Sequence, residues 1–262
     1  MNSRNYLNAF YRNYDEENRL RSKCGMVEFI TTMHFLKRFL KPEKSILEVG
    51  AGTGRYSHEL AQKGYRVDAI ELIEHNIEEF KKRTLPDEPV TVRQGDATDL
   101  SIFQDNTYDI TLLLGPMYHL FTTEDQEQAL SEAIRVTKKG GIIFAAYCMS
   151  DPAVLSMGFL NGKIQEIAKE GMIDLETFKT FSRPEDIFAL YRKEDIEDLR
   201  QKFNVTPLHF IATDGHTHFM REKVEHMNDA VYDLYIKYHL ATCERQDMVG
   251  CSHHTLDIFQ KN

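Results

Sequence analysis

A short apolar run that ends in a glycine-rich loop is the feature that most constrains this chain. Residues 46–50 read Ile-Leu-Glu-Val-Gly, and Gly50, Gly52 and Gly54 follow at alternate positions. The apolar run is typical of a buried strand, and a helical pattern begins directly after the loop. Glycine permits backbone at positive φ and keeps side chains away from a ligand. The stretch therefore predicts a strand, loop and helix whose backbone touches a bound ligand.

Apolar strands alternate with amphipathic helices after this loop. We expect strands at 45–49, 66–71, 90–94, 108–114 and 142–147, and helices at 56–63, 74–83 and 123–137. Thr123 and Gln126 have the spacing of a capping box, and Lys138–Gly141 is interpreted as a helix end and a turn. This alternation predicts an α/β fold with a doubly wound, mostly parallel sheet. Ligands of such sheets bind at the carboxyl ends of the strands.

The remaining segments are interpreted as parts of one domain, 1–262, around a core at 42–149. Residues 1–41 are expected to be helical and to cover either the sheet or a bound ligand. Residues 150–201 lack the alternation, and we expect a helical cap there, with ordinary packing on the sheet edge as the alternative. Within 202–262 we expect strands at 203–213 and 255–260. An amphipathic helix is expected from Met220 to Tyr238.

Composition narrows the choice of partners. The 262 residues carry a formal net charge of -9, from 32 basic and 41 acidic residues, which disfavours broad nucleic-acid binding. Apolar runs stay well short of the about 18 residues of a membrane span, and the N-terminus does not resemble a signal peptide. The four cysteines are scattered, which favours a reduced, cytoplasmic setting.

Three carboxylates at successive strand ends suggest the ligand. The loop departs from G-x-G-x-x-G because Arg55 takes the sixth position, and Glu48 precedes the first glycine. An acid there is a poor neighbour for a pyrophosphate but suits an ammonium group, such as that of S-adenosylmethionine. Glu71 can accept two ribose hydroxyls, and Asp96 can accept an adenine amino group.

These motifs resemble those of the class I S-adenosylmethionine-dependent methyltransferases over about residues 42–148. The residues that carry the resemblance are Glu48–Gly54, Glu71, Gly95–Ala97, Tyr108–Ile110 and Leu114–Pro116. It implies a seven-stranded sheet whose last strand is antiparallel. It also implies that Gly50 and Gly52 line the methionine moiety and that Leu114 lies near the sulfonium. The other cofactor contacts that we expect are Glu48, Glu71, Leu72, Asp96 and Ala97, with Tyr14 and Arg21 as candidates in the N-terminal cover.

The methyl acceptor is expected beside residues 114–120. Tyr118 and His119 are the candidate catalytic residues: either takes a proton from the nucleophile, or both only position the substrate. Gly115-Pro116-Met117-Tyr118 departs from the Asn/Asp-Pro-Pro-aromatic pattern of many amino-methyltransferases, which argues against DNA bases as acceptors. The histidines and cysteines of the last third match no compact ligand motif, so no metal is expected, although His216 and His218 could reach the cleft.

The sequence thus predicts a methyltransferase that transfers a methyl group in line to a small molecule. The expected partners are this substrate and at most a second copy of the chain (monomer or homodimer), without nucleic acid or membrane. A non-catalytic S-adenosylmethionine-binding protein is the alternative from another class. An NAD-dependent oxidoreductase is a weaker alternative, because its G-x-G-x-x-G motif has a glycine at the sixth position, where this chain has Arg55.

Overall fold

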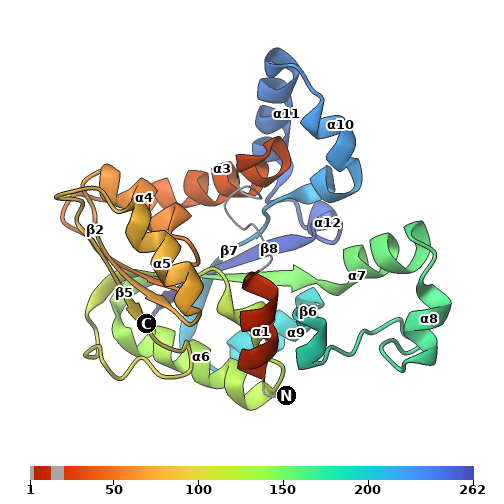
Figure 1. Ribbon diagram of the computed structural model, residues 1–262, viewed down its shortest axis with the longest axis horizontal. Coiled ribbons are helices and arrows are strands. Elements are labelled where there is room, and N and C mark those ends of the chain that lie inside the picture. The colour runs from red at the N-terminus through yellow and green to blue at the C-terminus, as the bar shows by residue number, and fades with distance from the viewer. Residues whose placement is uncertain (1–2, 13–20) are drawn as a thin grey trace.

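A twisted sheet with helices on both faces forms the centre of the computed structural model, which describes residues 3–12 and 21–262 (Figure 1). The strands are β1 (Ser45–Val49), β2 (Arg66–Glu71), β3 (Val90–Gln94), β4 (Tyr108–Leu113), β5 (Thr137–Met149), β6 (Leu190–Tyr191), β7 (Val205–Ala212) and β8 (His254–Lys261). Seven of them follow the order β3-β2-β1-β4-β5-β8-β7, and the two-residue β6 pairs with β5 outside this order.

The helices lie between and around these strands. The α-helices are α1 (Ser3–Tyr11), α3 (Lys23–Lys37), α4 (Arg55–Gln62), α5 (Glu74–Arg83), α6 (Thr123–Val136), α7 (Ser150–Ala153), α8 (Ile164–Lys169), α9 (Lys193–Gln201), α10 (Arg221–Glu225), α11 (Asp229–Thr242) and α12 (Gln246–Val249). Shorter helical turns are η1 (Pro116–His119), η3 (Pro184–Asp186) and η4 (Gly215–Met220), and η2 (Val154–Leu160) is a π-helix.

The sheet is parallel through β1 to β5, and β8 runs antiparallel to both of its neighbours, β5 and β7. The prediction of a mostly parallel sheet with an antiparallel last strand is therefore confirmed. Parallel strands place their carboxyl ends at one edge of the sheet, and the loops after β1, β2, β3 and β4 meet there.

Alternate side chains of the central strands enter opposite hydrophobic layers, as a pleated strand requires. Leu47 and Val49 pack in the layer that contains α6 and α9, whereas Ile46 packs in the layer that contains α3 and α4. Both layers contain fully buried side chains, so the near-continuous apolar sequence of β1 reflects burial on both faces.

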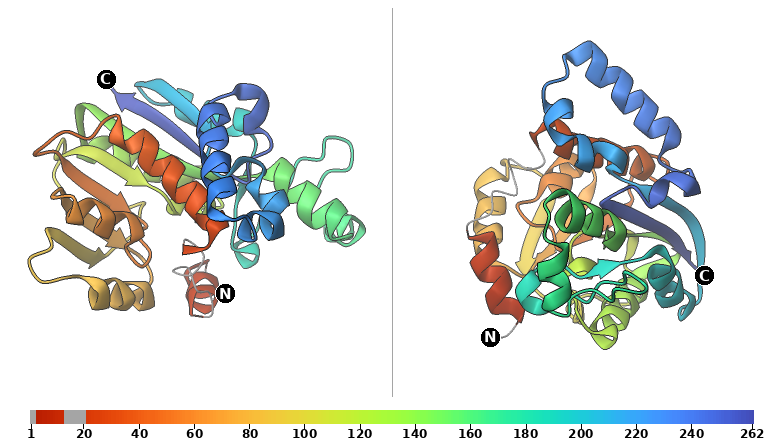
Figure 2. Two further views of the ribbon diagram at one scale, coloured as in Figure 1. Left: turned by 90° about the horizontal axis from the view of Figure 1, so that it is seen from above. Right: turned by 90° about the vertical axis from the view of Figure 1, so that its right-hand side faces the viewer.

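Two segments project from the sheet. The hairpin of α7, η2 and α8 extends to one side, and α10 with α11 forms an arm at another (Figure 1). Near the N-terminus, α1 packs against η3, so the first helix lies beside the 150–201 segment (Figure 2, right). Among the helices of residues 3–12 and 21–262, none has the length and apolar character needed to cross a membrane.

Three local expectations were wrong. The expected helix from Met220 to Tyr238 is divided into η4, α10 and α11, because the Asn228 side chain accepts from Val231 N at 3.0 Å and starts a new helix. Residues 138–141 continue β5 instead of forming a turn. Helix α6 is capped by Thr122, whose Oγ1 accepts from Asp125 N at 3.1 Å, and not by Thr123.

Candidate functional site

A cavity of about 520 Å³ lies at the carboxyl ends of the parallel strands. Its volume falls in the range of small-molecule and cofactor sites, roughly 300–1,000 Å³. The glycine loop forms part of its wall, together with the ends of β2, β3 and β4, helix α1 and Glu28 of α3. Segments that are far apart in the sequence therefore form one cavity wall.

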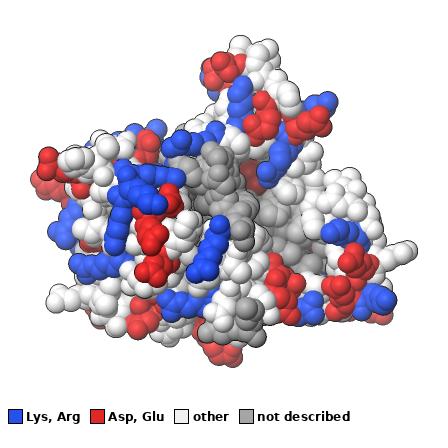
Figure 3. All heavy atoms as spheres, viewed as in Figure 1, with Lys and Arg blue, Asp and Glu red and all other residues white. Residues whose placement is uncertain are grey.

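On the molecular surface shown in Figure 3, acidic and basic side chains are intermixed.

The glycine loop needs glycine for different reasons at different positions. A Cβ on Gly50 would lie 2.5 Å from Cδ of Pro116, so Gly50 permits close packing of two loops. Gly52 has φ +55°, and a Cβ there would meet no atom within 4 Å among the described residues. Since Gly52 also lines the cavity, its missing side chain leaves room for a ligand.

Two buried carboxylates flank this loop. Glu48 is 1% exposed and accepts a hydrogen bond from the Ser57 hydroxyl. Burial raises the pKa of Glu48 to about 8, and the nearby Glu71 carboxylate adds to this increase. A cationic group bound at this wall favours the ionised form of Glu48, which can then pair with it.

Glu71 holds the glycine loop in position. Its Oε2 accepts from Gly52 N at 2.7 Å, and its Oε1 accepts from Ile73 N at 2.9 Å and from Asn76 Nδ2 at 3.3 Å. Burial raises the pKa of Glu71, against the effect of these hydrogen bonds. The side chain therefore both lines the cavity and connects the ends of β1 and β2.

The loop after β3 brings Asp96 and Ala97 to the same cavity, and Leu72 lines it from the end of β2. Asp96 is exposed, and its Oδ1 accepts from Thr98 N at 3.0 Å and from Thr98 Oγ1 at 2.9 Å. Ala97 is buried.

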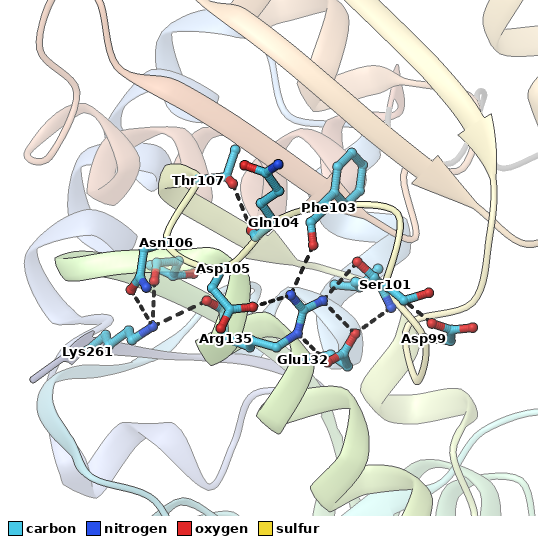
Figure 4. Close-up of polar contacts among 12 residues, drawn as sticks. Asp99, Ser101, Phe103, Gln104, Asp105, Asn106, Thr107, Glu132, Arg135 and Lys261 are labelled. Carbon is cyan, nitrogen blue, oxygen red and sulfur yellow. Dashed lines mark hydrogen bonds and ion pairs between the residues drawn. The ribbon is translucent and has the colours of Figure 1, made fainter.

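Arg135 of α6 anchors the continuation of this loop (Figure 4). Its guanidinium donates to the carbonyl oxygens of Leu100 and Phe103, each at 2.9 Å, and to Asp105 at 2.7 Å. The same group pairs with Glu132 at 2.7 Å. Because several donors of one rigid fork are engaged, the loop that follows Asp96 is held firmly against α6.

The wall opposite the glycine loop is aromatic. Leu114, Tyr118 and His119 all line the cavity. The Tyr118 hydroxyl donates to the Leu114 carbonyl at 2.8 Å. The His119 ring lies between the Ile187 carbonyl, 2.8 Å from Nδ1, and the Tyr11 hydroxyl, 2.8 Å from Nε2.

This geometry defines the state of His119. A carbonyl oxygen only accepts, so Nδ1 carries the proton and Nε2 accepts from the Tyr11 hydroxyl. Burial lowers the pKa of His119 to about 4, so the ring is neutral at pH 7. The Nε2 lone pair therefore accepts the hydrogen bond of Tyr11, which also lines the cavity.

Other expected residues lie elsewhere. Tyr14 lies outside the described residues. Arg21 is exposed and is absent from the described lining of the cavity. The first helix instead contributes Arg4, Leu7 and Tyr11. The sequence did not indicate Glu28 as a site residue. Tyr11 was expected only as part of an N-terminal segment that covers the ligand, on the signal of the aromatic face of residues 6–11.

The 150–201 segment touches the site through a short stretch. Pro184 lines the cavity, and the Ala189 N–H donates to the Tyr118 carbonyl at 2.8 Å. The Phe188 ring lies 5.4 Å from the His119 ring and 5.7 Å from the Phe10 ring, centroid to centroid. Helix α8 extends away from this contact (Figure 1). His218 borders a small adjacent recess, and His216 borders another, so in the described residues neither lines the main cavity.

Comparisons with known proteins point to one family. Residues 47–145 match the model of a family described as methyltransferase domain. A demethylmenaquinone methyltransferase from Clavibacter sepedonicus is 34% identical over 111 residues, which are 42% of this chain and 43% of that protein. An S-adenosyl-L-methionine-dependent Diels-Alderase from Talaromyces variabilis is 30% identical over 100 residues, 37% of this chain and 33% of that protein. The chain therefore spans less than half the length of these relatives.

The fold extends further than the sequence match. A solved structure of an S-adenosylmethionine-dependent methyltransferase from Thermotoga maritima superimposes with a TM-score of 0.59 over 100% of both chains, at 19% identity. At that identity the likeness supports the fold, and the chemistry must be argued from the site itself.

Proposed function

Residues 47–145 belong to the class I S-adenosylmethionine-dependent methyltransferases, and from this premise we propose that the chain methylates a small molecule. The observation that carries the proposal is a cavity that joins the open side of Gly52, two buried carboxylates and an aromatic wall. Its confined volume and the intermixed surface charges favour a small acceptor over a nucleic acid.

S-adenosylmethionine is proposed to bind along the glycine-loop side of the cavity. Glu48 would pair with the ammonium group, and the open space at Gly52 would admit the methionine moiety, because both residues line the cavity. Glu71 has three donors among the described residues, so its carboxylate retains acceptor capacity for a ribose hydroxyl. Asp96 and Ala97, which line the same cavity, would meet the adenine. When bound, the cofactor supplies a methyl group that is electrophilic because it is attached to a sulfonium.

The aromatic wall is proposed to hold the acceptor. Methyl transfer needs an aligned, desolvated nucleophile more than it needs strong acid–base catalysis. Neutral His119 orients the Tyr11 hydroxyl, and the Leu114 carbonyl orients the Tyr118 hydroxyl. We therefore assign His119 as a positioning residue that acts through Tyr11, and Tyr118 and Tyr11 as the groups that meet the acceptor.

We also propose that residues 150–201 act as a cap and residues 1–41 as a cover of this cavity. Pro184 and α1 support this view, because they close neighbouring parts of the wall and pack on each other. The cap would work through residues 184–191, while α7, η2 and α8 lie further out (Figure 1).

A second candidate function is cofactor binding without methyl transfer. The match to a relative named as a Diels-Alderase favours this alternative, since that name describes an S-adenosyl-L-methionine-dependent protein with another reaction. Both functions predict binding of the cofactor, and only methyltransferase activity predicts formation of S-adenosylhomocysteine with a methylated product.

Two measurements test the proposal in order. Calorimetry with S-adenosylmethionine should show saturable binding, and NAD should not compete; a chain that prefers NAD would overturn the assignment. Incubation with methyl-labelled S-adenosylmethionine and mixtures of small phenols, amines and thiols should then give labelled product together with S-adenosylhomocysteine. Conversion of an acceptor while the cofactor's label is retained would support the second candidate.

A further inference from the structure

A cluster of metal-ligand side chains lies at the same edge of the sheet, outside the glycine loop. Cys148 near the end of β5 pairs with His254 at the start of β8 in the antiparallel register. The Cys148 Sγ and one ring nitrogen each of His253 and His254 lie within 4.8 Å of one another. Cys148 lies more than 100 positions before the two adjacent histidines, so no sequence motif indicated the group.

Hydrogen bonds orient His254 as they orient a metal ligand. Its Nδ1 lies 3.0 Å from Asp214 Oδ2, which leaves Nε2 on the other side of the ring. Asp214 is itself held by the Ser252 hydroxyl at 2.7 Å and by His254 N at 3.1 Å. A carboxylate that accepts from one imidazole nitrogen while the other binds metal is a recurrent arrangement around zinc.

His253 supplies an independent observation. Its Nδ1 is buried and has no hydrogen-bond partner among the described residues. The ring stacks on the His218 ring, with centroids 4.4 Å apart and planes inclined by 9°. A buried ring nitrogen without a partner costs free energy unless something else binds it.

We propose that Cys148, His253 and His254 bind a zinc ion. One thiolate and two imidazoles are a donor set that suits Zn²⁺. The bond lengths of such a site require donor atoms about 3.3–3.6 Å apart, so the donor atoms need to approach one another by at most about 1.5 Å around the ion. Asp214, and Glu28 with Oε2 3.8 Å from His254 Nδ1, add negative charge that offsets the ion.

Three protein ligands leave a fourth position, the arrangement of catalytic zinc sites. Of the three ligands, His254 borders a recess of about 30 Å³, which Asp214 and Glu28 also line. Glu28 lines the main cavity as well. The His254 ring lies 6.3 Å from the Tyr118 ring, centroid to centroid. The proposed zinc site therefore lies close to the main cavity, whose wall includes Tyr118 and Glu28.

Cobalt(II) is the probe that tests this site. The full chain, stripped with a chelator and titrated with Co²⁺, should take up one ion with tetrahedral d–d absorption and a thiolate-to-cobalt charge-transfer band. Zinc should displace the cobalt and remove both signals. X-ray absorption of the zinc form should report one sulfur and two imidazole neighbours. A wild-type chain without the charge-transfer band, or with a sulfur-free zinc shell, overturns the proposal.

Variants assign the ligands. Cys148→Ser should lose the charge-transfer band, and His254→Gln should weaken zinc binding at least tenfold; Asp214→Asn should weaken it about 10–100-fold as a positioning change. Cys251→Ser and His226→Gln, which lie outside the group, should bind zinc as the wild type does. Calorimetry with S-adenosylmethionine checks that each variant is folded. Retention of the band in a folded Cys148→Ser variant would refute the assignment without affecting the proposed methyltransferase activity.

Discussion

At the scale of single residues, Glu48 links the site to pH. Its pKa of about 8 means that most chains carry a neutral Glu48 at pH 6, whereas an ammonium ligand binds the ionised form. Binding should therefore release a proton, and affinity for S-adenosylmethionine should rise with pH between 6 and 8, by at most about tenfold per unit. Calorimetry in buffers of different ionisation enthalpy measures this release.

The matched variant is Glu48→Gln, which keeps the shape of the side chain and removes its ionisable carboxyl group. It should bind the cofactor more weakly at pH 8 and show almost no change of affinity between pH 6 and 8. A wild-type affinity that is constant over this range would remove Glu48 from the ammonium site.

Gly52 provides a second test at this scale. Gly52→Val places a branched side chain in the open space beside the loop, so cofactor binding should fall below detection. The positive φ adds about 1–2 kcal/mol of strain in the folded state. Gly64→Val is the control, because Gly64 also has positive φ and open space but does not line the described cavity. If Gly52→Val and Gly64→Val bind S-adenosylmethionine equally well, Gly52 does not face the ligand.

At the scale of elements, Arg135 shows how one side chain holds a loop. Arg135→Gln removes the guanidinium donor of the Phe103 carbonyl and one of the two donors of the Leu100 carbonyl, which also accepts from Phe103 N. The substitution should lower the free energy of unfolding by about 1–3 kcal/mol. Arg245→Gln removes an exposed ion pair with Asp247 and should change the free energy of unfolding by less than about 0.5 kcal/mol. Urea unfolding of both variants makes the comparison, and equal losses would contradict a special role of Arg135.

Element bounds were predictable where the sequence pattern changes sharply at both ends of the element. The predicted ranges 45–49, 66–71, 74–83 and 90–94 are those of β1, β2, α5 and β3, because each apolar pattern is interrupted by polar or turn residues at both ends. The apolar pattern of α11 did not correspond to a buried face, because Val231, Leu234 and Tyr238 are 46%, 64% and 53% exposed. Periodicity identifies an apolar face but not whether another element covers it.

At the scale of the whole molecule, α1 closes the cavity from a distant part of the sequence. Removal of residues 1–12 eliminates Leu7 and Tyr11 from the wall and should weaken cofactor binding roughly tenfold, the order expected from loss of a buried apolar contact. Asn5→Ala, at an exposed position of the same helix, should leave the affinity unchanged. Calorimetry that finds full affinity in the truncated chain would rule out the cover.

The sequence by itself determined the parallel sheet, the glycine loop and the positions of Glu48, Glu71, Asp96 and Leu114. These features depend on local patterns, since a strand end and the loop after it are adjacent in the chain. Only the tertiary structure decided that Tyr11 engages His119 and that Cys148 meets His254. Those pairs join segments more than 100 residues apart, and their contacts arise from the sheet register and helix packing rather than from any spacing along the chain.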